Sequence, residues 1–104
     1  MSVGAAGEVV AARFLERRDA VVIDRNVRVG RDEIDLIVRI DGERVAVEVK
    51  TGLGPDARPW ENFDHDKRAR IRRAAHRLSI RRVDLIAVEL ASDGVTIRWL
   101  PGVG

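Results

Sequence analysis

A hairpin pattern at residues 31–50 constrains the fold of this chain more than any other segment. Residues 33–40 and 43–50 both alternate apolar and polar side chains, as half-buried strands do. Between them lies Asp41-Gly42, a strong signal for a two-residue turn, because glycine accepts a positive φ and aspartate tolerates it. The segment therefore predicts two antiparallel strands. The aliphatic side chains of the first strand are expected on one face: Ile34, Leu36, Val38 and Ile40.

The register of this hairpin brings three charged side chains together. Counting from a two-residue turn places Ile34 opposite Val49 and Asp35 opposite Glu48. Lys50 shares the face of Glu48, since side chains two residues apart on a strand point the same way. Carboxylates directly opposite each other have Cβ atoms about 4.5–5.5 Å apart and repel. A hard divalent cation, which takes carboxylate oxygens as ligands, would relieve that repulsion.

The spacing Asp35…Glu48-x-Lys50 is suited to phosphodiester chemistry. Two carboxylates can position a metal ion that activates water, and an ammonium group can stabilise the charge of the transition state. The alternative interpretation is an ordinary hairpin with one solvated face. Ile37 and Ala46 share the face of the charged residues, which argues against a simply wet surface.

The remaining segments predict one α/β domain over residues 1–104. Helical spacing of apolar residues covers 4–18, and strands are expected at 20–28, 83–90 and 95–100. A second helix should follow Asp64, a plausible N-cap, with an apolar stripe on one side. Residues 51–59 are glycine- and proline-rich and predict a loop. The order is α-β-β-β-α-β-β, and the crossover through the second helix should make strands 43–50 and 83–90 parallel.

Composition excludes several classes of protein. The chain has no cysteine, so a disulfide framework or a thiolate metal site is ruled out, and a reducing compartment fits. No apolar run approaches the roughly 20 residues of a membrane span, and no secretory signal opens the sequence. We therefore expect a cytoplasmic protein without a membrane partner.

The second predicted helix carries a block of positive charge. Residues 67–82 hold eight basic residues and no acidic one. Such a block can neutralise phosphates of a nucleic acid and would make binding salt-dependent. A solvated arginine-rich helix and a helix lying on an anionic membrane are the alternatives, although the narrow, alanine-rich apolar stripe suits packing on a sheet better. The residues expected to bind nucleic acid are Lys67, Arg68, Arg70, Arg73 and Arg77.

In order and spacing, six segments together resemble the YraN-like family of bacterial, endonuclease-like proteins, within the PD-(D/E)xK nuclease superfamily. The resemblance implies a restriction-endonuclease-like fold, with an α-β-β-β-α-β core and a mixed sheet flanked by helices. The segments are GAAGEVVAARFL (4–15), RNVR (25–28), EIDLI (33–37), VAVEVKT (45–51), KRARIRRAAHRL (67–78) and RVDLIAV (82–88).

The resemblance also implies a catalytic centre of Asp35, Glu48 and Lys50, with Mg²⁺ or Mn²⁺ as the cofactor. Glu8 matches an extra acid of the resolvase branch, which would make Asp35, Glu48 and Glu8 the metal ligands. By itself, an acid in a first helical turn can equally serve the helix dipole. The fold is similar to that of archaeal Holliday junction resolvases, which act as dimers on branched DNA, so a homodimer on DNA is expected.

Two residues depart from the family pattern. Asp32 stands where the family usually has Gly, and Gly52 stands where it usually has Arg. The second change removes a potential phosphate contact.

Three functions are compatible with these features. The first is a metal-dependent endonuclease that hydrolyses phosphodiester bonds of nucleic acid, with branched DNA as one substrate. The second is a nucleic-acid-binding module that keeps the fold without catalysis, and the third is a protein-interaction domain. The basic residues would bind phosphates, and phosphates are common to branched, linear and single-stranded DNA and to RNA.

Overall fold

The computed structural model describes residues 1–54 and 57–103, and the predicted order of elements is confirmed. The short 3₁₀ helix η1 was not predicted. Strand β3 runs three residues beyond its predicted end, into the segment expected to be a loop. Residues 55 and 56 of that predicted loop lie outside the described residues. The elements are α1 (Val3–Glu16), β1 (Val21–Val29), β2 (Asp32–Ile40), β3 (Glu43–Leu53), η1 (Pro59–Asn62), α2 (His65–Arg77), β4 (Arg82–Ala91) and β5 (Gly94–Leu100).

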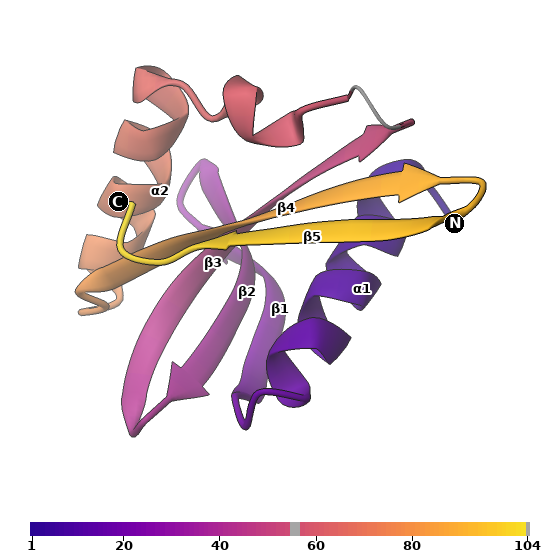
Figure 1. Ribbon diagram of the computed structural model, residues 1–104. Coiled ribbons are helices and arrows are strands. Elements are labelled where there is room, and N and C mark those ends of the chain that lie inside the picture. The colour runs from indigo at the N-terminus through magenta and orange to yellow at the C-terminus, as the bar shows by residue number, and fades with distance from the viewer. Residues whose placement is uncertain (55–56, 104) are drawn as a thin grey trace.

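The strands form one mixed sheet in the order β1-β2-β3-β4-β5. Among the described strands, β3 and β4 alone pair in parallel, as the crossover through α2 predicted. The two long helices lie on opposite sides of the sheet (Figure 1). This arrangement is the α-β-β-β-α-β core of the restriction-endonuclease-like fold, with β5 added at one edge.

Each face of the sheet has its own hydrophobic cluster. Leu15 of α1 packs with Leu36, Val47 and Ile86 on one face. On the other face Ile71 of α2 packs with the aliphatic side chains of Ile34, Ile37, Val83 and Leu85. β4 is buried from residue 83 to 89, which is the pattern of a strand covered on both sides.

The predicted hairpin register is confirmed near the turn. Ile40 pairs with Glu43, Val38 with Val45, and Leu36 with Val47. Asp41 and Gly42 both have positive φ, at 51° and 80°. A two-residue turn with two positive φ angles matches the twist of the strands it joins.

The expected alternation of β2 is wrong at Ile34. Leu36 and Val38 pack under α1, whereas Ile34 packs with the cluster under α2. The pleat is therefore interrupted at Asp35. A break of this kind turns every side chain beyond it to the opposite face of the sheet.

Both helices begin where side chains cap them. Ser2 accepts a hydrogen bond from the Ala5 amide at 3.1 Å, and Asp64, as predicted, accepts one from the Lys67 amide at 3.0 Å. Gly7 of α1 lies so close to β3 that a Cβ atom at this position would collide with the Thr51 side chain. This close approach places Glu8 beside the strands that carry the candidate site.

A buried aspartate ties the last two strands to the C-terminal turn. Asp84 is fully buried, and its carboxylate accepts two hydrogen bonds from the Arg82 guanidinium, at 2.9 and 3.0 Å. The Trp99 indole and the Gly102 amide each donate a further bond of 2.9 Å. Asp84 is thus a structural acid, paired with the nearby Arg82.

Candidate active site

The candidate site lies where β2 and β3 part. Among the described residues, the paired register of these strands runs no further than Leu36 and Val47. Beyond it, β2 continues alongside β1, and β3 continues alongside β4, so the sheet forks (Figure 1). The predicted pairing of Ile34 with Val49 is therefore absent. Asp35 and Glu48 are the next residues after the last pair, and they stand at the fork itself.

Asp35 takes the place of a strand partner for β3. Its carboxylate accepts a hydrogen bond of 2.7 Å from the Val49 amide. This contact satisfies a backbone donor that the fork would otherwise leave without a neighbouring strand. The same contact anchors the Asp35 side chain between the two strands, within reach of Glu48.

Glu48 and Asp35 meet as the hairpin pattern predicted. Burial, first, and then a hydrogen bond and charge repulsion from Asp35 raise the pKa of Glu48 to about 9, against a smaller opposing effect of Lys50. Glu48 is therefore protonated near neutral pH in the absence of a cation. A bound divalent cation can supply the free energy that is needed to ionise both acids.

Glu8 and Asn26 extend this acidic cluster on the side of α1. In the amide orientation that satisfies its neighbours, Asn26 donates to Glu8 Oε1 at 2.8 Å and to Glu33 Oε1 at 3.3 Å. Burial, followed by the charges of Asp35 and Glu33, raises the pKa of Glu8. Asn26 has a positive φ of 51°, a conformation that asparagine tolerates better than most residues. Sequence reasoning gave Asn26 no definite role, and only its position on β1 reveals one.

The other side of the fork opens into a basic groove. A cavity of about 230 Å³ is lined by Glu48 and Lys50 of β3 and by Lys67 and Arg70 of α2. Lys50 is two residues from Glu48 on the same strand, about 7 Å along it. The remaining lining residues of the groove are Arg31, Asp32, Glu33 and Ile71. The groove thus holds four cations and three acids, one of which is Glu48 of the pair.

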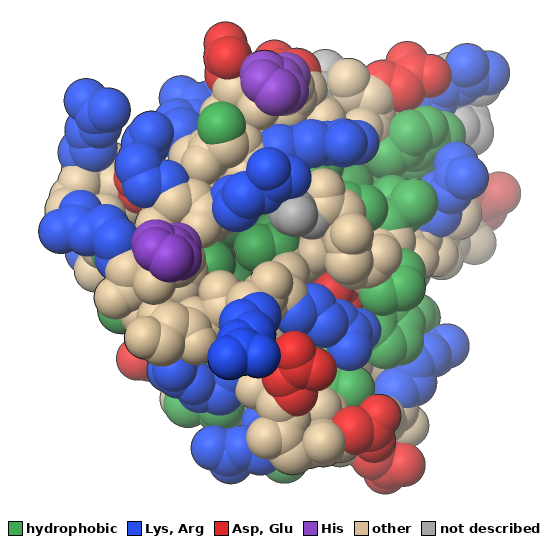
Figure 2. Space-filling model, turned by 90° about the vertical axis from the view of Figure 1, so that its left-hand side faces the viewer, with side chains coloured by type: hydrophobic (Ala, Val, Ile, Leu, Met, Phe, Trp, Pro, Cys, Tyr) green, Lys and Arg blue, Asp and Glu red, His purple; other side chains and the backbone are tan. Residues whose placement is uncertain are grey.

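The five basic residues predicted on α2 have different surroundings. Lys67 and Arg70 line the groove beside Lys50. The Arg68 guanidinium lies 5.5 Å from the centre of the Phe63 ring, and Arg77 lies against Gly30. Arg73 donates two hydrogen bonds to Asp32. Figure 2 shows Lys and Arg side chains spread widely over the face on which α2 lies.

The two departures from the family pattern both have structural consequences. Asp32 forms a two-pronged ion pair with Arg73, and the Asp32 side chain is only 7% exposed. Gly52 has no room for a side chain, because a Cβ atom there would lie 2.5 Å from the Ala57 Cβ. Ala57 therefore packs where the side chain of an arginine at position 52 would begin.

Arg31 is a candidate residue that sequence reasoning missed. It lies in the turn between β1 and β2, and it lines the same groove as Arg70 of α2. In the sequence Arg31 is an isolated arginine before an acidic stretch, outside the basic block of α2. Its place in the groove depends on the β1–β2 turn lying near α2, and no local sequence pattern encodes that contact.

The donor set at the fork fits a hard divalent ion. Asp35 and Glu48 offer only carboxylate oxygens, and their mutual repulsion is the feature that such an ion removes. Within residues 1–54 and 57–103, no three Asp, Glu or His side chains converge closely enough to surround an ion. Two carboxylates with water and substrate phosphate are nevertheless a usual ligand set for Mg²⁺.

The Glu48→Gln variant tests the proton at the fork. In the unfolded chain Glu48 loses its proton above its ordinary pKa of 4.5, whereas the folded protein keeps that proton up to about pH 9. The free energy of unfolding should therefore fall as the pH rises from 4.5 to about 9. Glutamine can still donate to Asp35 but cannot ionise. Without divalent ions, the wild type should therefore lose up to about 1.4 kcal/mol of unfolding free energy per pH unit relative to the variant.

Urea unfolding at several pH values between 5 and 9 in a chelating buffer measures this difference. A Glu43→Gln variant is the control, since Glu43 is exposed near the hairpin turn. Parallel stability curves for wild type and Glu48→Gln would show that Glu48 is ionised in the folded protein.

Comparison with known proteins identifies relatives along most of the chain. The model of "Uncharacterised protein family UPF0102" matches residues 7–88. A UPF0102 protein of Roseiflexus castenholzii is 38% identical over 91% of this chain and 86% of its own length. One of Beutenbergia cavernae is 39% identical over 99% of this chain and 96% of its own.

Two solved structures align with the chain at low identity. SSO0001 aligns with a TM-score of 0.41 and 18% identity, over 89% of this chain and 50% of that one. Pyrococcus furiosus SfsA, solved in complex with Ca²⁺, aligns with a TM-score of 0.38 and 15% identity, over 96% of this chain and 62% of that one. The chain thus spans 50% of SSO0001 and 62% of SfsA. Among the described residues, no helix combines the length and apolar character needed to cross a membrane.

Proposed function

This chain belongs to the UPF0102 family, the YraN family, and from its nuclease-like fold and its forked acidic site we propose that it is a divalent-cation-dependent nuclease. The observation that carries the proposal is the contact of Asp35 with Glu48 at the fork, beside Lys50 and a basic groove. The reaction would be hydrolysis of a phosphodiester bond in nucleic acid, with DNA, branched DNA included, as the first substrate to test.

Asp35 and Glu48 would hold Mg²⁺ or Mn²⁺, and Glu8 would contact it directly or through water. When bound, such an ion polarises the phosphoryl oxygen and lowers the pKa of a coordinated water. The Val49 amide orients Asp35, and Asn26 orients Glu8, so two of the acids are held by hydrogen bonds before any substrate arrives. Side chains fixed in this way lose little freedom on binding.

Lys50 is the expected catalytic cation. Its ammonium group lies on the groove side of the fork, where it can orient the attacking water or stabilise the negative charge that develops on the phosphate. Lys67 and Arg70 would hold the phosphates of the strand by charge, with binding that weakens as salt rises. The proposal concerns contacts with the phosphate backbone, which all these nucleic acids share.

Calorimetric titration with Mn²⁺ tests the metal site directly. Wild-type protein should bind the ion, and Asp35→Asn should weaken binding at least about tenfold, since the amide keeps the hydrogen bond to Val49 but loses the charge. Asp66→Asn is the control, because Asp66 is an exposed acid on α2. Equal Mn²⁺ binding by wild type and Asp35→Asn would exclude the site.

A cleavage screen then separates the nuclease from a binding module. Branched, nicked and linear duplex DNA, single strands and RNA should be tested with Mg²⁺ and with Mn²⁺. Metal binding together with salt-sensitive nucleic-acid binding, but without cleavage of any substrate, would favour the non-catalytic module.

A further inference from the structure

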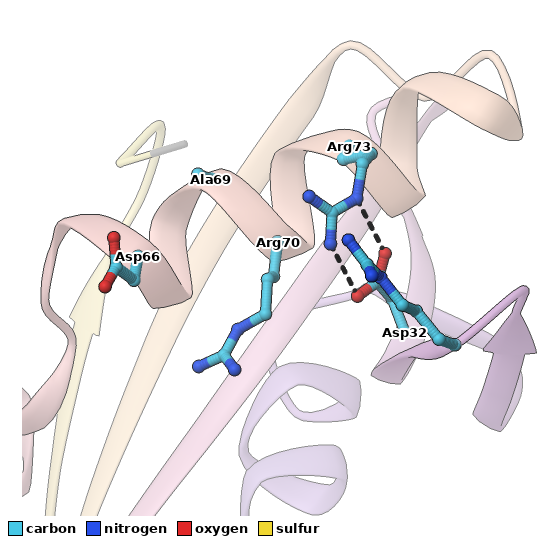
Figure 3. Close-up of a pocket in the computed structure, with 6 residues that line it drawn as sticks. Asp32, Asp66, Ala69, Arg70 and Arg73 are labelled. Carbon is cyan, nitrogen blue, oxygen red and sulfur yellow. Dashed lines mark hydrogen bonds and ion pairs between the residues drawn. The ribbon is translucent and has the colours of Figure 1, made fainter.

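Three arginines lie around a single carboxylate, that of Asp32, next to the groove, and one of them is bonded to it. Arg31 lies in the turn before β2, and Arg70 and Arg73 are three residues apart on α2, so they share one side of the helix. Arg73 Nε and Nη2 donate to the two Asp32 carboxylate oxygens at 3.0 and 2.9 Å (Figure 3). The Arg70 side chain extends away from this pair in Figure 3.

Asp32 cannot neutralise all three cations. Its hydrogen bonds with Arg73, and then the charges of Arg73, Arg31 and Arg70, lower the pKa of Asp32, so the acid is ionised and all three arginines lie near it. One negative charge among three positive ones leaves two in excess. Asp66 also lines this region, but its carboxylate lies beside the first turn of α2, apart from the ion pair (Figure 3).

The arginine cluster continues the groove of the candidate active site. It lines a cavity of about 540 Å³, together with Asp66 and Ala69. Arg31, Asp32 and Arg70 also line the cavity that holds Glu48 and Lys50. Arg31 and Arg70 therefore mark the boundary between the two hollows, one from the turn and one from the helix. A phosphate backbone that extends from the acidic site into the larger cavity would lie beside both arginines.

We propose that Arg31 and Arg70 clamp a backbone phosphate that flanks the phosphate to be cut, and that Asp32 keeps Arg73 out of this contact. The inference rests on the proposed function for the identity of its ligand. A guanidinium presents a planar fork of donors that matches phosphate oxygens. In Arg73 two of these donors are already used by Asp32.

The salt dependence of DNA binding distinguishes the three arginines. We would measure anisotropy of a fluorescent duplex at several salt concentrations, in a chelating buffer that prevents cleavage. Arg31→Ala and Arg70→Ala should each flatten the slope of log K against log salt by about 0.9, the loss of one phosphate contact. Arg73→Ala should leave the slope unchanged, like the control Arg81→Ala, which changes an exposed arginine beyond the far end of α2. Slopes for Arg31→Ala and Arg70→Ala equal to that of Arg81→Ala would overturn the clamp.

The Asp32→Asn variant tests the second half of the proposal. Removing the carboxylate charge should release Arg73, so that the slope steepens by about one contact. Adding Arg73→Ala to Asp32→Asn should abolish that gain, although Arg73→Ala alone has no effect. A loss of slope on Arg73→Ala in the wild-type background would show that Asp32 does not withhold Arg73.

Inorganic pyrophosphate separates failure of the clamp from failure of the proposed nuclease. Titration of wild-type protein, followed by NMR of the arginine Nε–H groups, should shift the signals of Arg31 and Arg70 and leave that of Arg81 in place. This result would support the anion site even if no nucleic acid were cleaved. Cleavage that depends on Lys50 while pyrophosphate shifts neither arginine would instead overturn the clamp and leave the nuclease standing.

Discussion

A Lys50→Met variant is expected to lose about 10²–10³-fold of the rate of phosphodiester cleavage while it still binds nucleic acid and Mn²⁺. Removing one preorganised electrostatic contact to a transition state typically has an effect of this size. Methionine keeps most of the apolar stem of lysine, so the half-buried side chain still packs against β3 and α2. Single-turnover kinetics with saturating enzyme would measure the chemical step directly.

Lys67→Met is the matched comparison, because Lys50 and Lys67 are the two lysines of the chain and both line the groove. Lys67 lies on α2, outside the fork, so its loss should weaken binding and leave the rate at saturation close to that of the wild type. Equal losses of the saturated rate in both variants would mean that Lys50 acts only as one of several phosphate contacts.

Loss of the Asp84 carboxylate is expected to lower the free energy of unfolding by about 3–5 kcal/mol, which is the usual penalty for removing one partner of a buried ion pair. In Asp84→Ala the guanidinium of Arg82, the Trp99 indole and the Gly102 amide would all lose their acceptor. Domains are typically stable by only about 5–15 kcal/mol, so the variant should unfold at markedly lower urea concentration.

Asp24→Ala serves as the control for this effect. Asp24 is exposed on the edge strand β1, and its carboxylate accepts a hydrogen bond from the amide of the next residue, Arg25. Such a surface change should alter stability by less than about 0.5 kcal/mol. If Asp84→Ala and Asp24→Ala unfold at the same urea concentration, the network around Asp84 contributes little to stability.

The hairpin shows how far local pattern determines structure. Alternating side chains and the Asp41-Gly42 turn predicted the pairs nearest the turn, and these pairs are present. A side-chain period of two and the φ angles of a tight turn are local properties, so the sequence contains them. For the same reason Asp35 and Glu48 were correctly expected to meet.

The fork was not predictable from the same pattern. Continued alternation would have placed Ile34 opposite Val49, but β2 stays with β1 while β3 follows β4. Which neighbour a strand keeps depends on the packing of both sheet faces, and Ile34 turns to the α2 side as a result. The anchoring of Asp35 by the Val49 amide exists only because the strands part there.

By itself, then, the sequence determined the order of helices and strands, the turn at Asp41-Gly42 and the placement of Asp35, Glu48 and Lys50 on one hairpin, because these depend on neighbours along the chain. The tertiary structure alone decided that Asn26 holds Glu8, that Arg31 lines the same groove as Arg70, and that Asp32 binds Arg73. The last of these contacts joins residues 41 positions apart. Such contacts arise where a turn, a strand and a helix are packed on the same sheet, and no periodicity of the sequence encodes them.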